Sequence, residues 1–268
     1  MISLESVTKS FKENAILKDI SFSIQAGERV SLVGPGGCGK TTVLKILLGL
    51  LESDQGNVHL MGRAIRELKG RERIEVMKKV GMAFQQGGLF DFMTVQENLT
   101  FAMKHMTQMS QEEMVKKSQY LLDQVKLSRT ENQYPHELSG GMKRRVGIAR
   151  ALGTDPKVAI FDEPTSGLDP VTSTIILNMI LDLAGAERKT ALLVATSNVE
   201  IAVRFAERVI VIHEGKIVAD GPWRELLVHG SPWVKNFLGV RFIGLDLSYA
   251  HELDLPKEFI RQHWHQRN

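Results

Sequence analysis

The feature that most constrains this chain is a glycine-rich segment that fits the pattern G-x-x-x-x-G-K-[ST], namely Gly34-Pro35-Gly36-Gly37-Cys38-Gly39-Lys40-Thr41. The apolar run at 29–33 predicts a strand before it, and the apolar spacing at 41–50 predicts a helix after it. Glycines let such a loop curl so that its N–H groups point at phosphate oxygens, and the helix N-terminus adds partial positive charge. We expect Lys40 to reach the β- and γ-phosphates and the Thr41 hydroxyl to ligate Mg²⁺. Thr42, the next residue, is expected to belong to the nucleotide-binding segment. Residues 34–42 therefore predict a binding site for a nucleoside triphosphate.

Two adjacent carboxylates form a second candidate element. The apolar run at 158–161 ends in Asp162 and Glu163, and a strand buried on both faces has such a continuous apolar run. Its carboxyl end in a parallel sheet lies beside the nucleotide crevice. We expect Asp162 to hold the Mg²⁺ shell and Glu163 to polarise the attacking water as general base.

The order of the expected elements predicts an α/β fold with a parallel sheet. Strands are expected at 80–84, 158–161, 190–195 and 208–213 in addition to 29–33, and helices at 41–50, 170–184 and 199–207. Alternation of apolar and polar residues at 2–7 and 20–24 predicts an antiparallel β subdomain. A further strand is expected at 57–61, and the charged residues 64–79 predict a helix. The expected division is a core at 1–85 and 156–221, a helical subdomain at 86–155 and a C-terminal extension at 222–268, where the pattern weakens after Gly221.

Composition excludes several classes of protein. The chain of 268 residues is 43% hydrophobic and carries a formal charge of +3, which is too even to predict nucleic acid as a partner. No stretch approaches 18 consecutive apolar residues, and the N-terminus lacks the pattern of a signal peptide. Cys38 is the single cysteine, so a disulfide framework is excluded. We expect a soluble cytoplasmic protein in which Cys38 is a small loop residue and not a redox switch.

A third segment, Leu138-Ser139-Gly140-Gly141-Met142, resembles the LSGGQ signature of ATP-binding cassette (ABC) proteins and lies 23 residues before Asp162, as in that family. Gln85 is similar to the Q-loop glutamine, residues 166–169 to the D-loop, and Phe11 to the aromatic residue that stacks on adenine. The resemblance covers about residues 1–225. It implies a P-loop NTPase with a RecA-like core, an antiparallel β subdomain and an inserted α-helical signature subdomain.

The resemblance also implies how ATP and Mg²⁺ are bound. Gln85 would contact both Mg²⁺ and the γ-phosphate. In a head-to-tail homodimer, Ser139, Gly140 and Gly141 would bind the γ-phosphate in the partner's site, and Asp169 of the D-loop would lie at the same interface. A helix N-terminus binds phosphate well, but the signature helix belongs to the helical subdomain, too far from the chain's own phosphate loop.

The kind of cassette is narrowed by what the chain lacks. It contains one cassette, and only 122 positions separate Lys40 from Asp162, without a coiled coil. The resemblance therefore implies the ATPase subunit of a transporter with separate integral-membrane permease subunits, peripheral at the cytoplasmic face of the inner membrane. Residues 86–99, which follow Gln85, are similar to cassettes of MCE-type phospholipid transporters, as are Met142 with Arg144-Arg145 and residues 234–238. An MCE-domain protein is then an expected partner. A small-solute importer is the alternative, since LF-x-x-x-TV-x-EN also occurs there.

Two further expectations concern an apolar segment and a single residue. Leu89, Phe90, Phe92 and Met93 are expected to be exposed and to suit a groove for a coupling helix of the membrane subunit. Ser197 stands where the family places a switch histidine. Either Ser197 still hydrogen-bonds the γ-phosphate in a weakened ATPase, or the chain is a nucleotide-gated structural subunit that hardly hydrolyses ATP.

Overall fold

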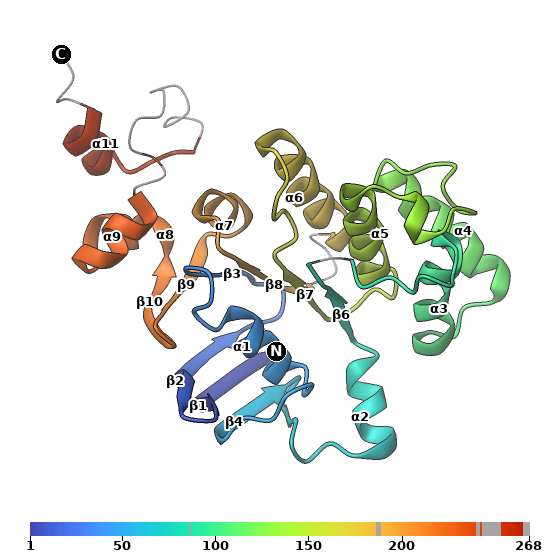
Figure 1. The fold of residues 1–268 in the computed structure, drawn as a ribbon, viewed down its shortest axis with the longest axis horizontal. Coiled ribbons are helices and arrows are strands. Elements are labelled where there is room, and N and C mark those ends of the chain that lie inside the picture. Colours follow the sequence, from blue (N-terminus) through green and yellow to red (C-terminus); the bar gives the residue numbers. More distant parts are fainter. Residues whose placement is uncertain (86, 186–188, 240–241, 243–252, 265–268) are drawn as a thin grey trace.

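The computed structural model describes the chain except residues 86, 186–188, 240–241, 243–252 and 265–268, and Figure 1 shows its arrangement. The larger sheet has the strand order β10-β9-β3-β8-β7-β6. Its strands are β3 (Arg29–Val33), β6 (Val80–Ala83), β7 (Val158–Asp162), β8 (Ala191–Thr196), β9 (Arg208–His213) and β10 (Lys216–Pro222). All neighbours are parallel except β9 and β10. The register pairs Val33 with Thr196 and Asp162 with Ala195, so the carboxyl ends of β3, β7 and β8 meet at one edge.

The smaller sheet is antiparallel and has the order β2-β1-β4-β5. Its strands are β1 (Ile2–Phe11), β2 (Asn14–Ile24), β4 (Gln55–Leu60) and β5 (Arg63–Ala64). The first two are longer than the sequence predicts, because the pairing shifts register between Leu4 and Val7 and again near Lys9. Ser6 and Asp19 have positive φ values of 50° and 59°, as bulged residues often do. A bulge adds one residue to a strand, so the alternation of apolar and polar residues is interrupted there and the strand is predicted too short.

The helices fall into three groups along the chain. The core has α1 (Lys40–Leu47), α2 (Gly70–Met77), α6 (Pro170–Ala184) and α7 (Val199–Phe205); the helical region has α3 (Val95–Met106), α4 (Gln111–Gln124), the 3₁₀ turn η1 (Pro135–Glu137) and α5 (Gly140–Leu152); and the C-terminal region has α8 (Trp223–His229), α9 (Pro232–Gly239) and α11 (Lys257–Trp264). The helix predicted over 64–79 is wrong in its first part, because β5 and a turn precede α2. In the part of the chain that the structure describes, no helix is long and apolar enough to cross a membrane.

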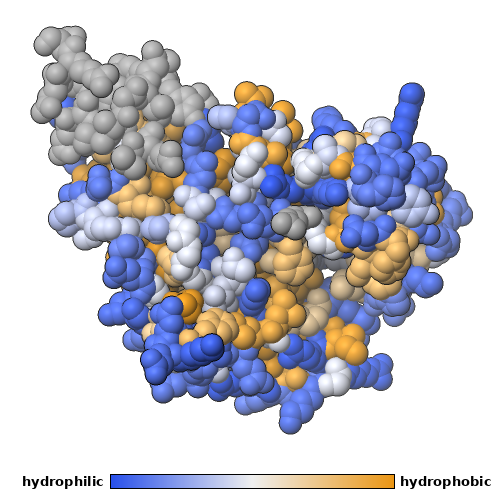
Figure 2. Space-filling view, in the orientation of Figure 1, coloured by the Kyte–Doolittle hydropathy of each residue, from blue (hydrophilic) through white to orange (hydrophobic). Residues whose placement is uncertain are grey.

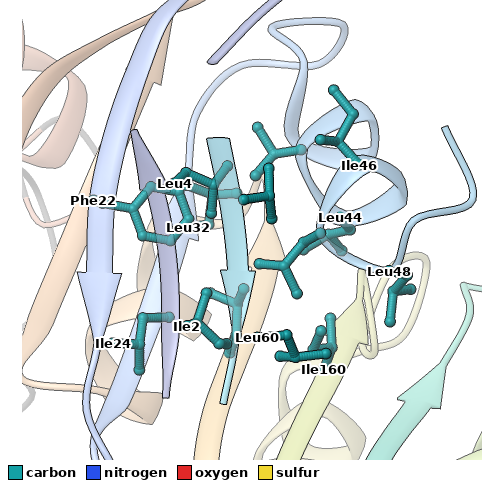
Figure 3. Close-up of a cluster of buried hydrophobic side chains, with 14 of the residues drawn as sticks. Ile2, Leu4, Phe22, Ile24, Leu32, Leu44, Ile46, Leu48, Leu60 and Ile160 are labelled. Carbon is teal, nitrogen blue, oxygen red and sulfur yellow. The ribbon is translucent and has the colours of Figure 1, made fainter. Parts of the chain in front are cut away.

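Three apolar clusters hold these layers together. The first lies between the small sheet, α1 and the larger sheet, and includes Leu4, Leu44 and Ile160 (Figure 3). The second joins α3, α4 and α5 to β7, β8 and α6, so the helical region packs directly on one side of the core. On the face shown in Figure 2, the remaining apolar residues form small patches among hydrophilic ones.

The third cluster packs the C-terminal region on the core. Trp223, Leu227 and Leu238 are buried with residues of α7 and β9, and the rings of His213 and Trp233 stack with centroids 3.9 Å apart. Strand β10 is not predicted from the sequence, and the weak pattern after Gly221 conceals the helices α8, α9 and α11. The strand signal of β10 is weak because the strand ends in Gly221 and Pro222.

Candidate nucleotide-binding site

A pocket of about 410 Å³ opens at the edge where β3, β7 and β8 end. It is lined by Phe11, Ile16, Gly36, Gly37, Gly39, Lys40, Thr41, Thr42, Gln85, Glu163, Ser166 and Ser197. All except Ile16 and Ser166 are site residues predicted from the sequence. Ser166 belongs to the segment that resembles the D-loop, and Ile16 comes from β2. Its apolar side chain carries no signal of its own, because only the pairing of β1 with β2 places it near Phe11.

The loop between β3 and α1 is shaped by two glycines at close approaches. A Cβ atom at Gly34 would lie 2.2 Å from the Ile212 carbonyl oxygen, and one at Gly39, where φ is 109°, would lie 2.6 Å from Leu17. Cys38 belongs to the loop and is buried, and burial raises the pKa of its thiol. A neutral buried thiol is a poor nucleophile, which agrees with its interpretation as a small loop residue.

Lys40 is the first residue of α1, and its side chain, 7% exposed, folds back on this loop. Its ammonium group donates hydrogen bonds to the carbonyl oxygens of Gly34 (2.8 Å) and Pro35 (3.1 Å). The same nitrogen lies 3.8 Å from Oε1 of Glu163. The charge is thus already positioned in the pocket and paired before any phosphate arrives.

The oxygen atoms beside the loop suit a hard cation. The Thr41 hydroxyl donates to Oδ2 of Asp162 at 3.0 Å, and Gln85 Nε2 donates to the Ser166 hydroxyl at 3.4 Å. Burial raises the pKa of Asp162, although the bond from Thr41 opposes this effect. A buried carboxylate whose charge is disfavoured is stabilised by a divalent cation, and hydroxyl, carboxylate and amide oxygens are ligands that Mg²⁺ accepts. The donor set therefore fits Mg²⁺.

Glu163 is held in an unusual conformation by the end of β8. Its φ is 45°, and its N–H donates to the Ala195 carbonyl oxygen at 2.8 Å. Its carboxylate accepts from the Thr196 hydroxyl at Oε2 (3.1 Å) and from the Ser197 N–H at Oε1 (2.8 Å). Asn198 caps α7 by accepting from the N–H groups of Glu200 and Ile201. The departure from the expected histidine therefore lies in a well-defined local structure.

Four predicted site residues lie away from the pocket. Ser139 is the N-cap of α5 and accepts from the Met142 N–H at 3.3 Å, and Gly140 borders a separate hollow of about 420 Å³. Asp169 caps α6 by accepting from the Thr172 N–H at 2.9 Å. Hydrogen bonds from the Thr172 side chain and N–H lower the pKa of its carboxyl. A Cβ atom at Gly140 would meet nothing within 4 Å, and one at Gly141 only Leu168. The packing of this chain thus does not require these glycines, and the backbone there is open to a ligand or a partner.

The surface expected at residues 89–93 is only partly exposed. Phe92 is 76% exposed and Phe90 37%, whereas Leu89 packs against the helical cluster and Met93 is half-buried. The expectation that all four are exposed is therefore wrong for Leu89 and Met93, because this loop packs back on α3. Phe90 instead borders an apolar groove of about 410 Å³ with Phe84, Phe101 and Met106 among its other walls.

With this geometry in place, comparison with known proteins identifies the class. The sequence model of the family described as "ABC transporter" matches residues 17–166, and the chain belongs to that family as an ATP-hydrolysing cassette. It is 38% identical to the "Protein TRIGALACTOSYLDIACYLGLYCEROL 3, chloroplastic" of Arabidopsis thaliana, over 88% of this chain and 73% of that protein. It is 36% identical to the "Probable ribonucleotide transport ATP-binding protein mkl" of Mycobacterium leprae, over 91% of this chain and 70% of that protein.

Two more similarities bear on the interpretation. The "Methionine import ATP-binding protein MetN" of Brucella abortus is 35% identical over 90% of this chain and 65% of that protein. Among solved structures, a dimeric post-hydrolysis state of the ATP-binding cassette MJ0796, bound to ADP and Pi, superposes with a TM-score of 0.77 at 33% identity. That similarity covers 83% of this chain and 98% of the other. The P-loop fold with its antiparallel β subdomain is thereby confirmed.

Proposed function

We propose that this ABC ATPase subunit powers phospholipid trafficking through separate membrane subunits, from the cytoplasmic face of the inner membrane. Two observations support a lipid. Residues 86–99 are similar to cassettes of MCE-type transporters, and one of the similar proteins is named after trigalactosyldiacylglycerol, a galactolipid. An MCE-domain protein is then the expected partner beside the permease.

The observation that carries the ATPase site is the convergence of Lys40, Thr41, Gln85 and Glu163 on one pocket. Lys40 and the loop N–H groups bind the β- and γ-phosphates. Thr41, Asp162 and Gln85 hold Mg²⁺, which when bound neutralises phosphate charge. Glu163 accepts the proton of the attacking water, and Lys40 balances its negative charge until nucleotide binds.

Adenine is proposed to stack on Phe11 at the edge of the pocket. The ring is 49% exposed, and Lys9 Nζ lies 5.6 Å from the ring centroid. Lys9 is itself bonded to Asp54 at 2.7 Å, and Asp54 also accepts from the Ser10 N–H. These contacts fix the end of β1 and leave the ring available for a base.

A homodimer completes the site. Ser139, Gly140 and Gly141 lie away from the pocket of their own chain, and the similar cassette MJ0796 was solved as a dimer. A second copy placed head to tail would bring its signature residues and Asp169 to the γ-phosphate. The groove beside Phe90 is the proposed contact for a coupling helix of the permease, together with exposed Phe92, whose ring centroid lies 5.8 Å from that of Phe90.

The test uses the assembled transporter in liposomes and the Glu163→Gln variant, which keeps the shape of the side chain but loses the proton acceptor. We expect steady-state hydrolysis by this complex to fall at least about a hundredfold. In the purified Glu163→Gln subunit, ATP should accumulate in a stable dimer, which size-exclusion chromatography detects as an ATP-dependent shift. Parental turnover in Glu163→Gln would reject Glu163 as the base. For the substrate, we expect phospholipid to stimulate the parental ATPase, and stimulation by methionine or a ribonucleotide alone would reject the lipid assignment.

A small-solute importer is the second candidate, favoured by the names of the two other similar proteins, which mention ribonucleotide transport and methionine import. The third, a structural subunit that hardly hydrolyses ATP, is favoured by Ser197 in place of histidine. The absolute turnover of the complete complex decides this point, because a structural subunit would show the same residual rate with and without Glu163→Gln.

A further inference from the structure

The contacts around Glu163 assign a role to a residue that the sequence motifs do not include. Thr196, the last residue of β8, is fully buried. Its hydroxyl accepts a hydrogen bond from the Asn198 N–H at 3.1 Å and lies 3.1 Å from Oε2 of Glu163. A hydroxyl has one proton to donate. Since the Asn198 N–H occupies an acceptor position of the oxygen, the proton is directed to the carboxylate.

Both oxygens of the Glu163 carboxylate thus accept hydrogen bonds from two consecutive residues at the carboxyl end of β8. Oε2 accepts from the Thr196 hydroxyl and Oε1 from the Ser197 N–H, while the Glu163 N–H returns a bond to Ala195. The pairing of Asp162 with Ala195 in neighbouring strands sets this geometry. Two donors at two oxygens fix the plane of the carboxylate as well as its position.

We propose that Thr196 is the positioning residue for the general base Glu163. This inference rests on the proposed function, in which Glu163 takes the proton of the attacking water. A general base must lie within about 2.6–3.2 Å of the atom that it deprotonates, and a glutamate side chain has three rotatable bonds. In this site, where serine replaces the switch histidine, the Thr196 hydroxyl and the Ser197 N–H restrict those bonds. Thr196 itself is not among the residues that line the nucleotide pocket.

Thr196→Val tests this role because valine keeps the branched shape and removes the hydroxyl. In the assembled transporter we expect kcat to fall about tenfold or more, as small misplacements of a reacting group do, with KM for ATP within about twofold. Thr196→Ser restores the hydroxyl and should recover kcat to within about threefold of the parental value. Combined with Glu163→Gln, Thr196→Val should cause no further loss, since the group that it positions is gone.

The matched control is Thr190→Val. Thr190 is also buried, and its hydroxyl donates to the Pro156 carbonyl oxygen at 3.0 Å, but it lies before β8, at the other end of that strand from the site. The Thr190→Val variant also loses a buried hydroxyl and should leave kcat unchanged. Thermal unfolding of all variants separates loss of folding from loss of rate, and Thr196→Ala supplies a second variant without the hydroxyl if valine does not fit.

Three results would overturn the proposal. These are parental kcat in a folded Thr196→Val, equal losses in Thr196→Ser and Thr196→Val, or a further loss when Thr196→Val is added to Glu163→Gln. Failure of the proposed function has a different signature. In that case Glu163→Gln itself hydrolyses ATP at the parental rate, whatever Thr196 does.

Discussion

Removing the Lys40 ammonium group tests the assignment of the phosphate site most directly. Two kinds of contact decide the size of the effect. With nucleotide, Lys40 would bond to phosphate oxygens, and hydrogen bonds to charged groups contribute about 1.5–3 kcal/mol each. Without nucleotide, it already donates to the carbonyl oxygens of Gly34 and Pro35 and lies 3.8 Å from Glu163.

Binding therefore exchanges contacts at Lys40 instead of adding them to a free charge. If two phosphate contacts of about 3 kcal/mol each replace two weaker carbonyl contacts of about 1.5 kcal/mol, the net contribution is about 3 kcal/mol. Each 1.4 kcal/mol corresponds to about tenfold in Kd. We thus expect Lys40→Ala to weaken ATP binding on the order of a hundredfold and to abolish hydrolysis at ordinary ATP concentrations.

The assay is calorimetric titration of ATP with Mg²⁺ into the parental protein, Lys40→Ala and Lys45→Ala. Lys45 lies in the last turn of α1, is exposed, and does not line the pocket. It should bind ATP as the parental protein does, which controls for a lost positive charge on the same helix. A Kd for Lys40→Ala within about threefold of the parental value would refute the assignment of Lys40 to the phosphates.

Three other substitutions test other parts of the site. Burial raises the pKa of Asp162. At pH values between the ordinary aspartate pKa and the raised one, the native state therefore binds more protons than the unfolded state. The stability that this group contributes rises as pH falls through that window. Asp162→Asn should therefore raise the Tm of the nucleotide-free protein at pH 7 while abolishing Mg²⁺-dependent hydrolysis; a lower Tm contradicts this. Phe92→Ala, at a side chain 76% exposed, should leave ATP binding intact and uncouple lipid transport, whereas Leu50→Ala, exposed at 63%, is the control; normal transport in Phe92→Ala rejects the contact. Ser197→His keeps the N–H bond to Glu163 and adds a donor for developing charge, so turnover should rise, by up to about a hundredfold, with KM unchanged; equal or lower turnover shows that the site does not lack a histidine.

Elements whose local signals agree with their tertiary environment could be predicted from the sequence to the residue. Strands β3 and β9 and helix α6 have the bounds that the sequence predicts. For α6 the reason is visible at both ends, because Asp169 caps the first turn, Pro170 is its first residue and Gly185 follows its last. The phosphate loop could be predicted for the same reason, since a contiguous motif carries both its fold and its chemistry.

Features that depend on pairing across the sheets could not be predicted. The bulges of β1 and β2 interrupt alternation, and β10, which ends in Gly221 and Pro222, pairs with β9 without a clear strand signal of its own. The lining residue Ile16 and the positioning residue Thr196 carry no motif. Thr196 reaches Glu163 across 33 residues, and the register of β7 against β8 decides which residue at the end of β8 does so.

The glycines of the chain separate into those that its own packing requires and those that it does not. Gly34 and Gly147 are required, because a Cβ atom would approach backbone atoms to 2.2 Å and 2.8 Å. Gly36 in the phosphate loop and Gly140 at the start of α5 have no atoms within 4 Å of such a Cβ. These open positions lie at two different hollows of the molecule, and both adjoin helix N-termini, where phosphate oxygens bind well. In the proposed head-to-tail pair, each copy would contribute the phosphate loop of one ATP site and the signature residues of the other. In this proposal ATP binding and dimerisation are one event. The apparent affinity for ATP should therefore depend on the protein concentration, and the fraction of dimer on the ATP concentration.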